Sequence, residues 1–212
     1  MARLDQLYDA ILNGDARKAV AATREAIAAN LDPVEIITGS MVPAMDEVGK
    51  RFEAEEYYVP ELLLSGRAMK NAMELLKPLM VASGTKPVGR VVIGTAKGDL
   101  HDIGKNLVAS MLQGGGFEIV DLGTDVAPEK YVEAVRAHNP DIVCLSALLT
   151  VTMPAMKATI DALSRAGLRE RVKVLVGGAP LTPQFAQDIG ADGYGETAIT
   201  AVGLARKALG IA

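Results

Sequence analysis

Residues 90–106 of the chain read RVVIGTAKGDLHDIGKN, and no other stretch says more about the fold. The opening run, Arg90–Gly94, is apolar and β-branched, a composition typical of a strand that is buried on both faces. A polar loop that contains glycine follows, and residues 103–113 then have helical spacing. A buried strand followed by a loop and a helix is the repeating unit of parallel sheets. The stretch therefore predicts an α/β domain.

The same alternation repeats along the rest of the chain. Five predicted strands alternate with five predicted helices, which favours a flavodoxin-like (Rossmann-like) parallel sheet with helices on both faces. Right-handed crossovers favour the strand order 2-1-3-4-5, and ligands of such sheets bind beyond the carboxyl ends of the strands, at the switch point between strands 1 and 3. The predicted strands are 90–94, 117–121, 141–146, 172–177 and 190–194, and the predicted helices are 103–113, 128–138, 152–166, 180–189 and 196–209.

The part of the chain before this domain has a different period. Apolar residues up to Met80 recur at spacings of three and four, which predicts four helices joined by short loops, a small antiparallel bundle. Asp32 is placed to cap a helix that begins at Pro33, and Pro43 predicts a kink or break inside the third helix. The segment Ser83–Pro87 reads as a linker. We therefore expect a helical domain at 1–86 and the α/β domain at 87–212.

Composition excludes several classes of protein. The formal charge of −4 over 212 residues argues against a nucleic-acid binder that depends on positive charge. One Cys excludes an intrachain disulfide, and two His leave little room for a metal site built wholly from protein ligands. The apolar runs are shorter than the ~18 residues of a membrane span, and the first residues lack the apolar core of a secretory signal. We expect a cytoplasmic protein that binds neither membranes nor nucleic acid.

The loop after the first strand does not match the common phosphate-binding motifs. A P-loop needs four residues between its glycines, whereas Gly98 and Gly104 are separated by five, and Asn106 stands where the Mg²⁺-binding Ser or Thr belongs. No G-x-G-x-x-G follows the strand, which argues against a dinucleotide site. Lys105 and Asn106 open the next helix, where contact with a ligand and plain solvent exposure are both open.

Two interpretations of His101 remain open from the residues alone. In the first, the imidazole simply caps or packs within its loop. In the second, it is the single axial ligand of a metal that a macrocycle already holds. Asp99 stands two residues earlier and can accept a hydrogen bond from the other ring nitrogen, which sets the tautomer and raises the basicity of the ligand. A hydroxyl after the third strand, from Thr152 or Ser146, can in turn donate to Asp99.

Glycines near this loop allow a bulky group to approach the backbone. Gly98 and Gly104 flank the histidine, and Gly177-Gly178 follow the fourth strand, where they leave a groove beside it. Haem is the other candidate macrocycle, but a polar slot at the edge of a parallel sheet is a poor haem pocket.

Three elements of the chain together resemble a known signature. They are Asp99-x-His101-x-x-Gly104, then Ser146-x-Leu148 after 41 residues, then Gly177-Gly178 after 28 more. This pattern is similar to the cobalamin-binding signature of B12-dependent methionine synthase and of the small corrinoid proteins of methyltransferase systems. Residues 41–73 (MVPAMDEVGKRFEAEEYYVPELLLSGRAMKNAM) resemble the helical cap of the same proteins.

The resemblance implies a cofactor and a set of site residues. The cofactor is cobalamin or a related corrinoid, bound base-off with His101 as the lower axial cobalt ligand. Asp99 and Thr152 form a proton relay behind His101, and the cap covers the methyl-bearing face of the corrin. The nucleotide tail runs past Ser146, Leu148, Thr150, Gly177 and Gly178, the loop residues Gly98, Asp102, Ile103 and Gly104 contact the cofactor, and Phe52 and Val59 are the cap residues over the corrin.

The resemblance also implies a function. The chain carries a methyl group from a substrate-specific methyltransferase to a second corrinoid-dependent methyltransferase that acts on tetrahydrofolate or a thiol, and a reductive activase is a further partner. The resemblance leaves no segment for a catalytic domain, so we expect no catalysis by the chain alone. The alternative is a B12-binding sensor or regulator, which usually needs an output module that the sequence does not display. A receiver domain is disfavoured because Asp141 begins the third strand instead of ending it.

Overall fold

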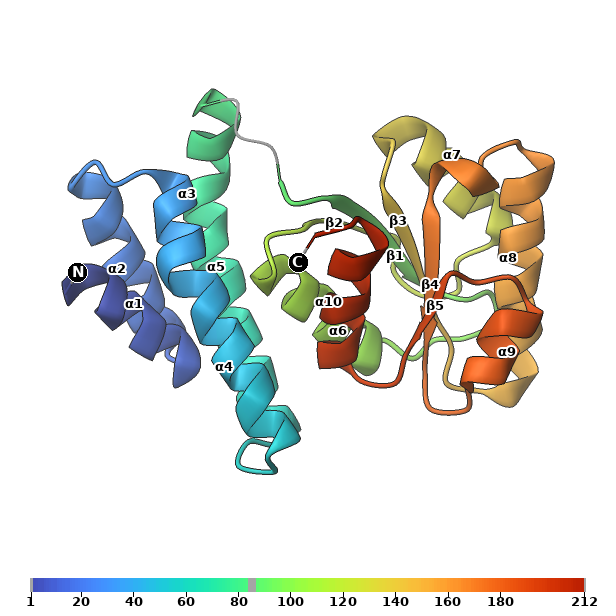
Figure 1. Cartoon of the computed structure of the whole chain (residues 1–212), viewed down its shortest axis with the longest axis horizontal. Helices are drawn as coiled ribbons and strands as arrows, with labels where there is room; N and C mark the ends of the chain where they lie inside the picture. The colour runs from blue at the N-terminus through green and yellow to red at the C-terminus, as the bar shows by residue number, and fades with distance from the viewer. Residues whose placement is uncertain (1, 84–86, 212) are drawn as a thin grey trace. The chain divides into compact units, whose positions relative to one another are not determined.

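The computed structural model describes residues 2–83 and 87–211, which form two compact units (Figure 1). One unit holds the residues up to Val88 together with Gln113–Gly116, and the other holds Gly89–Leu112 and the chain from Phe117 onward. Residues 84–86, the centre of the predicted linker and the place of the predicted boundary, lie outside the described residues.

The helical unit contains the bundle that the sequence predicts. Its first and second helices are α1 (Ala2–Leu12) and α2 (Ala16–Ala28), and the last is α5 (Val59–Ser83). The Asp15 carboxylate accepts the Lys18 N–H and caps α2, because the first turn of a helix has backbone donors without partners. The side chains of Leu7, Ile11 and Met69 have no exposed surface, so the apolar stripe of each helix faces a common core.

The third helix is interrupted where Pro43 predicts a break. It consists of α3 (Pro33–Ile36), a π-helical turn η1 (Ile37–Met41) and α4 (Val42–Glu53). The Val42 N–H bonds the Ile37 carbonyl, five residues back, so the turn before Pro43 is widened. The physical cause is that proline lacks an N–H and its ring collides with the carbonyl four residues earlier in a regular α-helix. At the start, Asp32 accepts the Val34 N–H and Pro33 is the first helical residue, as predicted.

The α/β unit is a parallel sheet in the order β2-β1-β3-β4-β5, which confirms the predicted topology. Helices α6 and α10 lie on one face of the sheet, and α7, α8 and α9 lie on the other (Figure 1). The strands are β1 (Arg90–Thr95), β2 (Glu118–Asp121), β3 (Ile142–Ser146), β4 (Lys173–Gly177) and β5 (Gly193–Gly195). The helices are α6 (Ile103–Gly114), α7 (Pro128–His138), η2 (Thr150–Thr152), α8 (Met153–Arg165), η3 (Arg169–Arg171), α9 (Pro183–Asp188) and α10 (Ala198–Ala208).

The strand register brings three loops to one edge of the sheet. Thr95 pairs with Ser146, and Ser146 pairs with Gly177, so β1, β3 and β4 end in one row. The central residues Val91, Val92 and Val143 are fully buried, and each such side chain contributes about 1.5–3 kcal/mol through burial. This packed core is a rigid base for the loops that follow the row.

The predicted boundaries differ most from the structure at β5 and α9. The strand begins at Gly193 instead of residue 190. The helix begins at Pro183 instead of residue 180, because the Thr182 hydroxyl caps it by accepting the Phe185 N–H. No helix within the described residues is both long enough and apolar enough to cross a bilayer.

Candidate functional site

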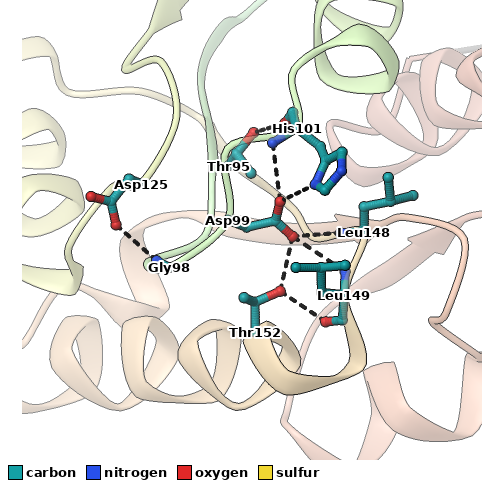
Figure 2. Close-up of polar contacts among 8 residues, drawn as sticks. All are labelled: Thr95, Gly98, Asp99, His101, Asp125, Leu148, Leu149 and Thr152. Atoms are coloured by element: carbon teal, nitrogen blue, oxygen red, sulfur yellow. Dashed lines mark hydrogen bonds and ion pairs between the residues drawn. The ribbon is translucent and has the colours of Figure 1, made fainter.

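The loop between β1 and α6 holds His101 against Asp99 (Figure 2). Nδ1 of His101 lies 2.7 Å from Oδ1 of Asp99, and the His101 backbone N–H donates to the same oxygen at 3.1 Å. Asp99 is completely buried, whereas 51% of the His101 side chain is exposed. The carboxylate therefore engages one ring nitrogen and orients the imidazole, and Nε2 remains outside this contact.

The second oxygen of Asp99 is held by the loop after β3. Oδ2 accepts the Leu148 N–H at 2.7 Å, the Leu149 N–H at 3.3 Å and the Thr152 hydroxyl at 2.9 Å. Burial by itself would raise the pKa of Asp99, but the hydrogen bonds from Leu148, His101 and Thr152 outweigh it and lower the pKa well below its usual range. Asp99 is therefore an anion at neutral pH, and an anion next to Nδ1 favours the tautomer that carries its proton there.

Of the two hydroxyls proposed to reach Asp99, Thr152 is the one in contact with it. Oγ1 of Thr152 lies 2.9 Å from Asp99 Oδ2 and 2.8 Å from the Leu149 carbonyl oxygen, so two acceptors compete for one proton. Ser146 instead ends β3, where its carbonyl accepts the Ala96 N–H. The row His101–Asp99–Thr152 thus runs from a half-exposed imidazole to a buried threonine.

The end of β2 and the loop between β2 and α7 contribute contacts that the sequence did not predict. Asp125 accepts the Gly98 N–H at 2.8 Å and forms an ion pair with Lys97 at 3.0 Å. Lys105, for which ligand contact and solvent exposure were both open, is buried instead, and its ammonium donates to Asp121 at 2.6 Å and to Asn106 at 2.7 Å. The available signal was positional, because Asp121 ends β2, the strand next to β1, and Asp125 follows it.

Exposed apolar side chains occur in the two loops that meet at Asp99. Leu100 and Ile103 lie in the His101 loop and at the start of α6, and Leu148, Leu149 and Val151 lie after β3. Their exposed fractions range from 41% for Leu149 to 81% for Val151. Large apolar side chains gathered in this way mark a surface that a ligand or partner covers. We call these five residues the apolar rim.

The glycines of the signature differ in what the fold requires of them. A methyl group at Gly104 would meet nothing within 4 Å, so the fold gives no reason for a glycine there. Gly98 has φ +86°, a conformation that favours glycine. A methyl group at Gly177 would lie 2.9 Å from the Gly195 carbonyl oxygen, and one at Gly178 would overlap the Ala147 carbonyl. The fold itself thus accounts for these two glycines, and their contact with a nucleotide tail stays a prediction.

The remaining predicted residues lie in two places. Asp102 is exposed and accepts the side-chain amide of Asn106 at 3.1 Å, and Thr150 is exposed at the start of η2. In the helical unit, Phe52 is half-buried near the end of α4, and Val59 begins α5 with 42% of its surface exposed. The α4–α5 turn between them is fixed by Tyr57, whose hydroxyl donates to the Leu12 carbonyl.

Fold and site together define a class of protein. The site offers one oriented, accessible imidazole at the switch point of a parallel sheet, an apolar rim, and an open space at Gly104 that a bound group can fill. A metal that already has four equatorial nitrogens in a macrocycle needs one such axial ligand, and the faces of a macrocycle need apolar contacts. Among the described residues, no cluster of three or more His, Cys, Asp and Glu is arranged to hold a metal ion. The residues fit a corrinoid.

Comparison with known proteins agrees with this class. Family models described as B12 binding domains match residues 89–203 and residues 3–77. Trimethylamine corrinoid protein 1 of Methanosarcina acetivorans is 45% identical over 203 residues, which cover 95% of this chain and 94% of that protein. Dimethylamine corrinoid protein 1 of the same organism is 43% identical over 194 residues, which cover 91% of each chain.

A solved structure extends the comparison. The methanol:cobalamin methyltransferase complex of Methanosarcina barkeri contains a chain with 31% identity and a TM-score of 0.87, and the match covers 99% of this chain and 80% of that one. The chain belongs to the family of B12-binding corrinoid proteins of methyltransferase systems, and it binds a corrinoid.

Proposed function

We propose that this methyl-carrying corrinoid protein holds cobalamin base-off, with His101 as the lower axial ligand, and carries a methyl group between two methyltransferases. The observation that carries the proposal is the 2.7 Å contact between His101 Nδ1 and the buried Asp99 carboxylate. It orients the ring and leaves Nε2 for a metal. When bound, the corrinoid supplies a cobalt centre that accepts a methyl group and gives it up again.

The residues of this chain then orient the axial ligand, tune it and protect the cofactor from water. Asp99 holds Nδ1 of His101 and so orients the ring, and the Thr152 hydroxyl donates to the other oxygen of Asp99, so these three side chains would form a proton relay behind the axial ligand. The apolar rim receives the corrin and keeps water from its lower face. We assign the nucleotide tail to the edge formed by Ser146, Leu148 and Thr150, and the cover of the upper face to Phe52 and Val59.

Two partner enzymes are part of the proposal. A methyltransferase partner is supported by the methanol:cobalamin methyltransferase complex, which contains a similar chain. The curated relatives are named for trimethylamine and dimethylamine, so methylamines are the first donors to test. The second methyltransferase of the proposal takes the methyl group to tetrahydrofolate or a thiol. A reductive activase is a further proposed partner, and we propose that all of these proteins work in the cytoplasm.

Reconstitution with hydroxocobalamin tests the cofactor part of this proposal. The wild-type protein is expected to keep the cofactor through desalting and to show the visible spectrum of histidine-ligated, base-off cobalamin. H101A is expected to lose this spectrum and to bind about tenfold or more weakly, because it lacks the axial ligand. H138A is the matched control, since His138 ends α7 away from the site and is the other histidine of the chain. A colourless wild-type protein, or H101A with an unchanged spectrum, contradicts the proposal.

Methyl transfer tests the carrier role. The loaded protein is first reduced chemically to cobalt(I) and incubated with a methylamine methyltransferase and a methylamine whose methyl group carries an isotope label. The label is then followed to a thiol acceptor in the presence of a second methyltransferase. A carrier passes the label on, whereas a sensor binds cobalamin but passes no methyl group in either direction.

A further inference from the structure

The loop that carries His101 is held from two sides. On one side, the loop after β3 binds the Asp99 carboxylate through Leu148, Leu149 and Thr152. On the other side, Asp125 contacts the main chain of the same loop, and Figure 2 shows Asp125 and Gly98 on the far side of Asp99 from Leu148. We propose that Asp125 is a positioning residue for His101, which rests on the function proposed for His101.

Asp125 makes two reciprocal hydrogen bonds with the His101 loop. Its carboxylate accepts the Gly98 N–H at 2.8 Å, and its own backbone N–H donates to the Asp99 carbonyl at 2.8 Å. These bonds fix the peptide group before Gly98 and the peptide group after the Asp99 Cα atom, and the peptide group between them is held by the Asp99 N–H, which donates to the Ala96 carbonyl at 3.0 Å. The direction in which the Asp99 side chain leaves the backbone is thereby set, and that side chain orients the imidazole.

The backbone conformation of Asp125 points to the same role. Among the described residues other than glycine, four have positive φ: Asn30, Glu55, Asp125 and Asn139. Asn139 is the C-cap of α7, and Asn30 and Glu55 directly follow the C-caps of α2 and α4, where a left-handed residue is an ordinary way to end a helix. Asp125, with φ +54°, lies between a strand and a helix, so no helix end accounts for it. A strained residue of this kind persists where surrounding contacts hold it.

The ion pair with Lys97 is a minor part of the arrangement. Both side chains are about half exposed, 54% for Lys97 and 42% for Asp125, and ion pairs at such exposure contribute little. The Gly98 N–H, followed by the Lys97 ammonium, lowers the pKa of Asp125, so the side chain is a carboxylate at neutral pH. The backbone contacts therefore carry the positioning role.

Three substitutions separate the contributions of Asp125. D125N keeps an acceptor for the Gly98 N–H and a residue that tolerates positive φ. D125G keeps the backbone conformation but loses the acceptor. D141N is the matched control, because the Asp141 carboxylate accepts the Arg90 N–H at 2.8 Å, an equivalent bond at the opposite end of β1.

Two readouts report on His101 itself. In the cofactor-free protein, NMR measures solvent exchange of the His101 Nδ1 proton, which the bond to Asp99 slows. In the protein loaded with hydroxocobalamin, the visible spectrum measures the histidine-ligated fraction. We expect D125G to speed the exchange about tenfold, the factor for one hydrogen bond to a charged group, and to lower the histidine-ligated fraction. D125N and D141N are expected to stay close to wild type in both.

The proposal is overturned if D125G matches wild type in both readouts, or if D141N changes them as much as D125G does. If D125G does not fold, the rate of hydrogen exchange at the Gly98 amide of the wild-type protein tests the bond to Asp125 instead. Gly98 is exposed, so exchange as fast as in a free loop would exclude the bond to Asp125. A wild-type protein that binds no cobalamin contradicts the proposed function instead, and the exchange measurements without cofactor still test Asp125.

Discussion

At the scale of single residues, Asp99 holds together two loops that are distant in the sequence. A buried carboxylate costs several kcal/mol unless donors surround it. Asp99 receives donors from its own loop (His101) and from the loop after β3 (Leu148, Leu149 and Thr152). The same contacts that stabilise the anion therefore fix the position of the imidazole, so folding and ligand geometry depend on one group.

A substitution at Gly104 is expected to change the affinity for cobalamin without lowering the free energy of unfolding. Because a methyl group there meets nothing within 4 Å in the protein, we expect G104A to leave the free energy of unfolding unchanged or to raise it by up to about 1 kcal/mol, in line with helix propensity. Its affinity for cobalamin should fall about tenfold or more, because the methyl group intrudes on the bound corrinoid. Denaturant titration and equilibrium binding measure the two effects.

G203A is the control for this substitution, since Gly203 also has open space around it but lies in α10. If G104A bound cobalamin as tightly as G203A and wild type, Gly104 would not face the cofactor.

The single thiol of the chain makes stability depend on pH. Burial in β3 raises the pKa of Cys144 to about 12, whereas an unfolded thiol ionises near ~8.5. Below pH ~8.5 both states hold the proton, and the contribution of Cys144 to stability is complete. Above it only the unfolded state releases the proton, so the free energy of unfolding falls by up to about 1.4 kcal/mol per pH unit until the folded thiol ionises.

Urea titrations between pH ~8 and ~9 measure this slope, in a range that lies below the ordinary pKa of tyrosine. C144A should show a shallower slope than wild type, whatever its absolute stability. Equal slopes in the two proteins would mean that Cys144 is not buried as described.

At the scale of elements, the turn after β4 depends on a glycine that supports the site indirectly. Gly178 has φ +140°, and a methyl group on it would overlap the Ala147 carbonyl, one residue before Leu148. We expect G178A to lower the free energy of unfolding by roughly 3 kcal/mol and to weaken cobalamin binding, because the β3 loop must move away from Asp99. G203A, the same change in an open helical position, should be neutral or stabilising. G178A with wild-type stability would contradict this account.

The sequence predicted the elements well where a simple period governs them. The strand runs, such as Arg90–Gly94, are apolar because both faces of the sheet are covered, and such continuous apolar runs are easy to recognise in a sequence. The widened turn η1 was predicted only as a break at Pro43, because composition does not say how a helix absorbs a missing N–H. Asp125 gave only a positional signal, since its role depends on a left-handed conformation and on a loop distant in the sequence.

At the scale of the whole molecule, the chain combines a helical unit and an α/β unit, both matched by B12-binding family models. The signature residues come from three segments far apart in the sequence, and the register of β1, β3 and β4 gathers them at one edge. The sequence could predict that edge because parallel strands in a known order end together. From the residues alone it could not choose between Thr152 and Ser146 as the donor to Asp99, since that choice depends on the path of one loop, and it was the resemblance that implied Thr152.

The central claim is that His101 supplies the lower axial ligand of the cobalt, and electron paramagnetic resonance tests it most directly. The loaded protein is reduced to cobalt(II), whose unpaired electron couples to an axial nitrogen. We expect each cobalt line to be split into a triplet in the unlabelled protein and into a doublet when the histidines carry ¹⁵N. The doublet should persist in H138A and disappear in H101A. A triplet that ¹⁵N-histidine leaves unchanged would show that the nitrogen comes from elsewhere and would contradict the claim.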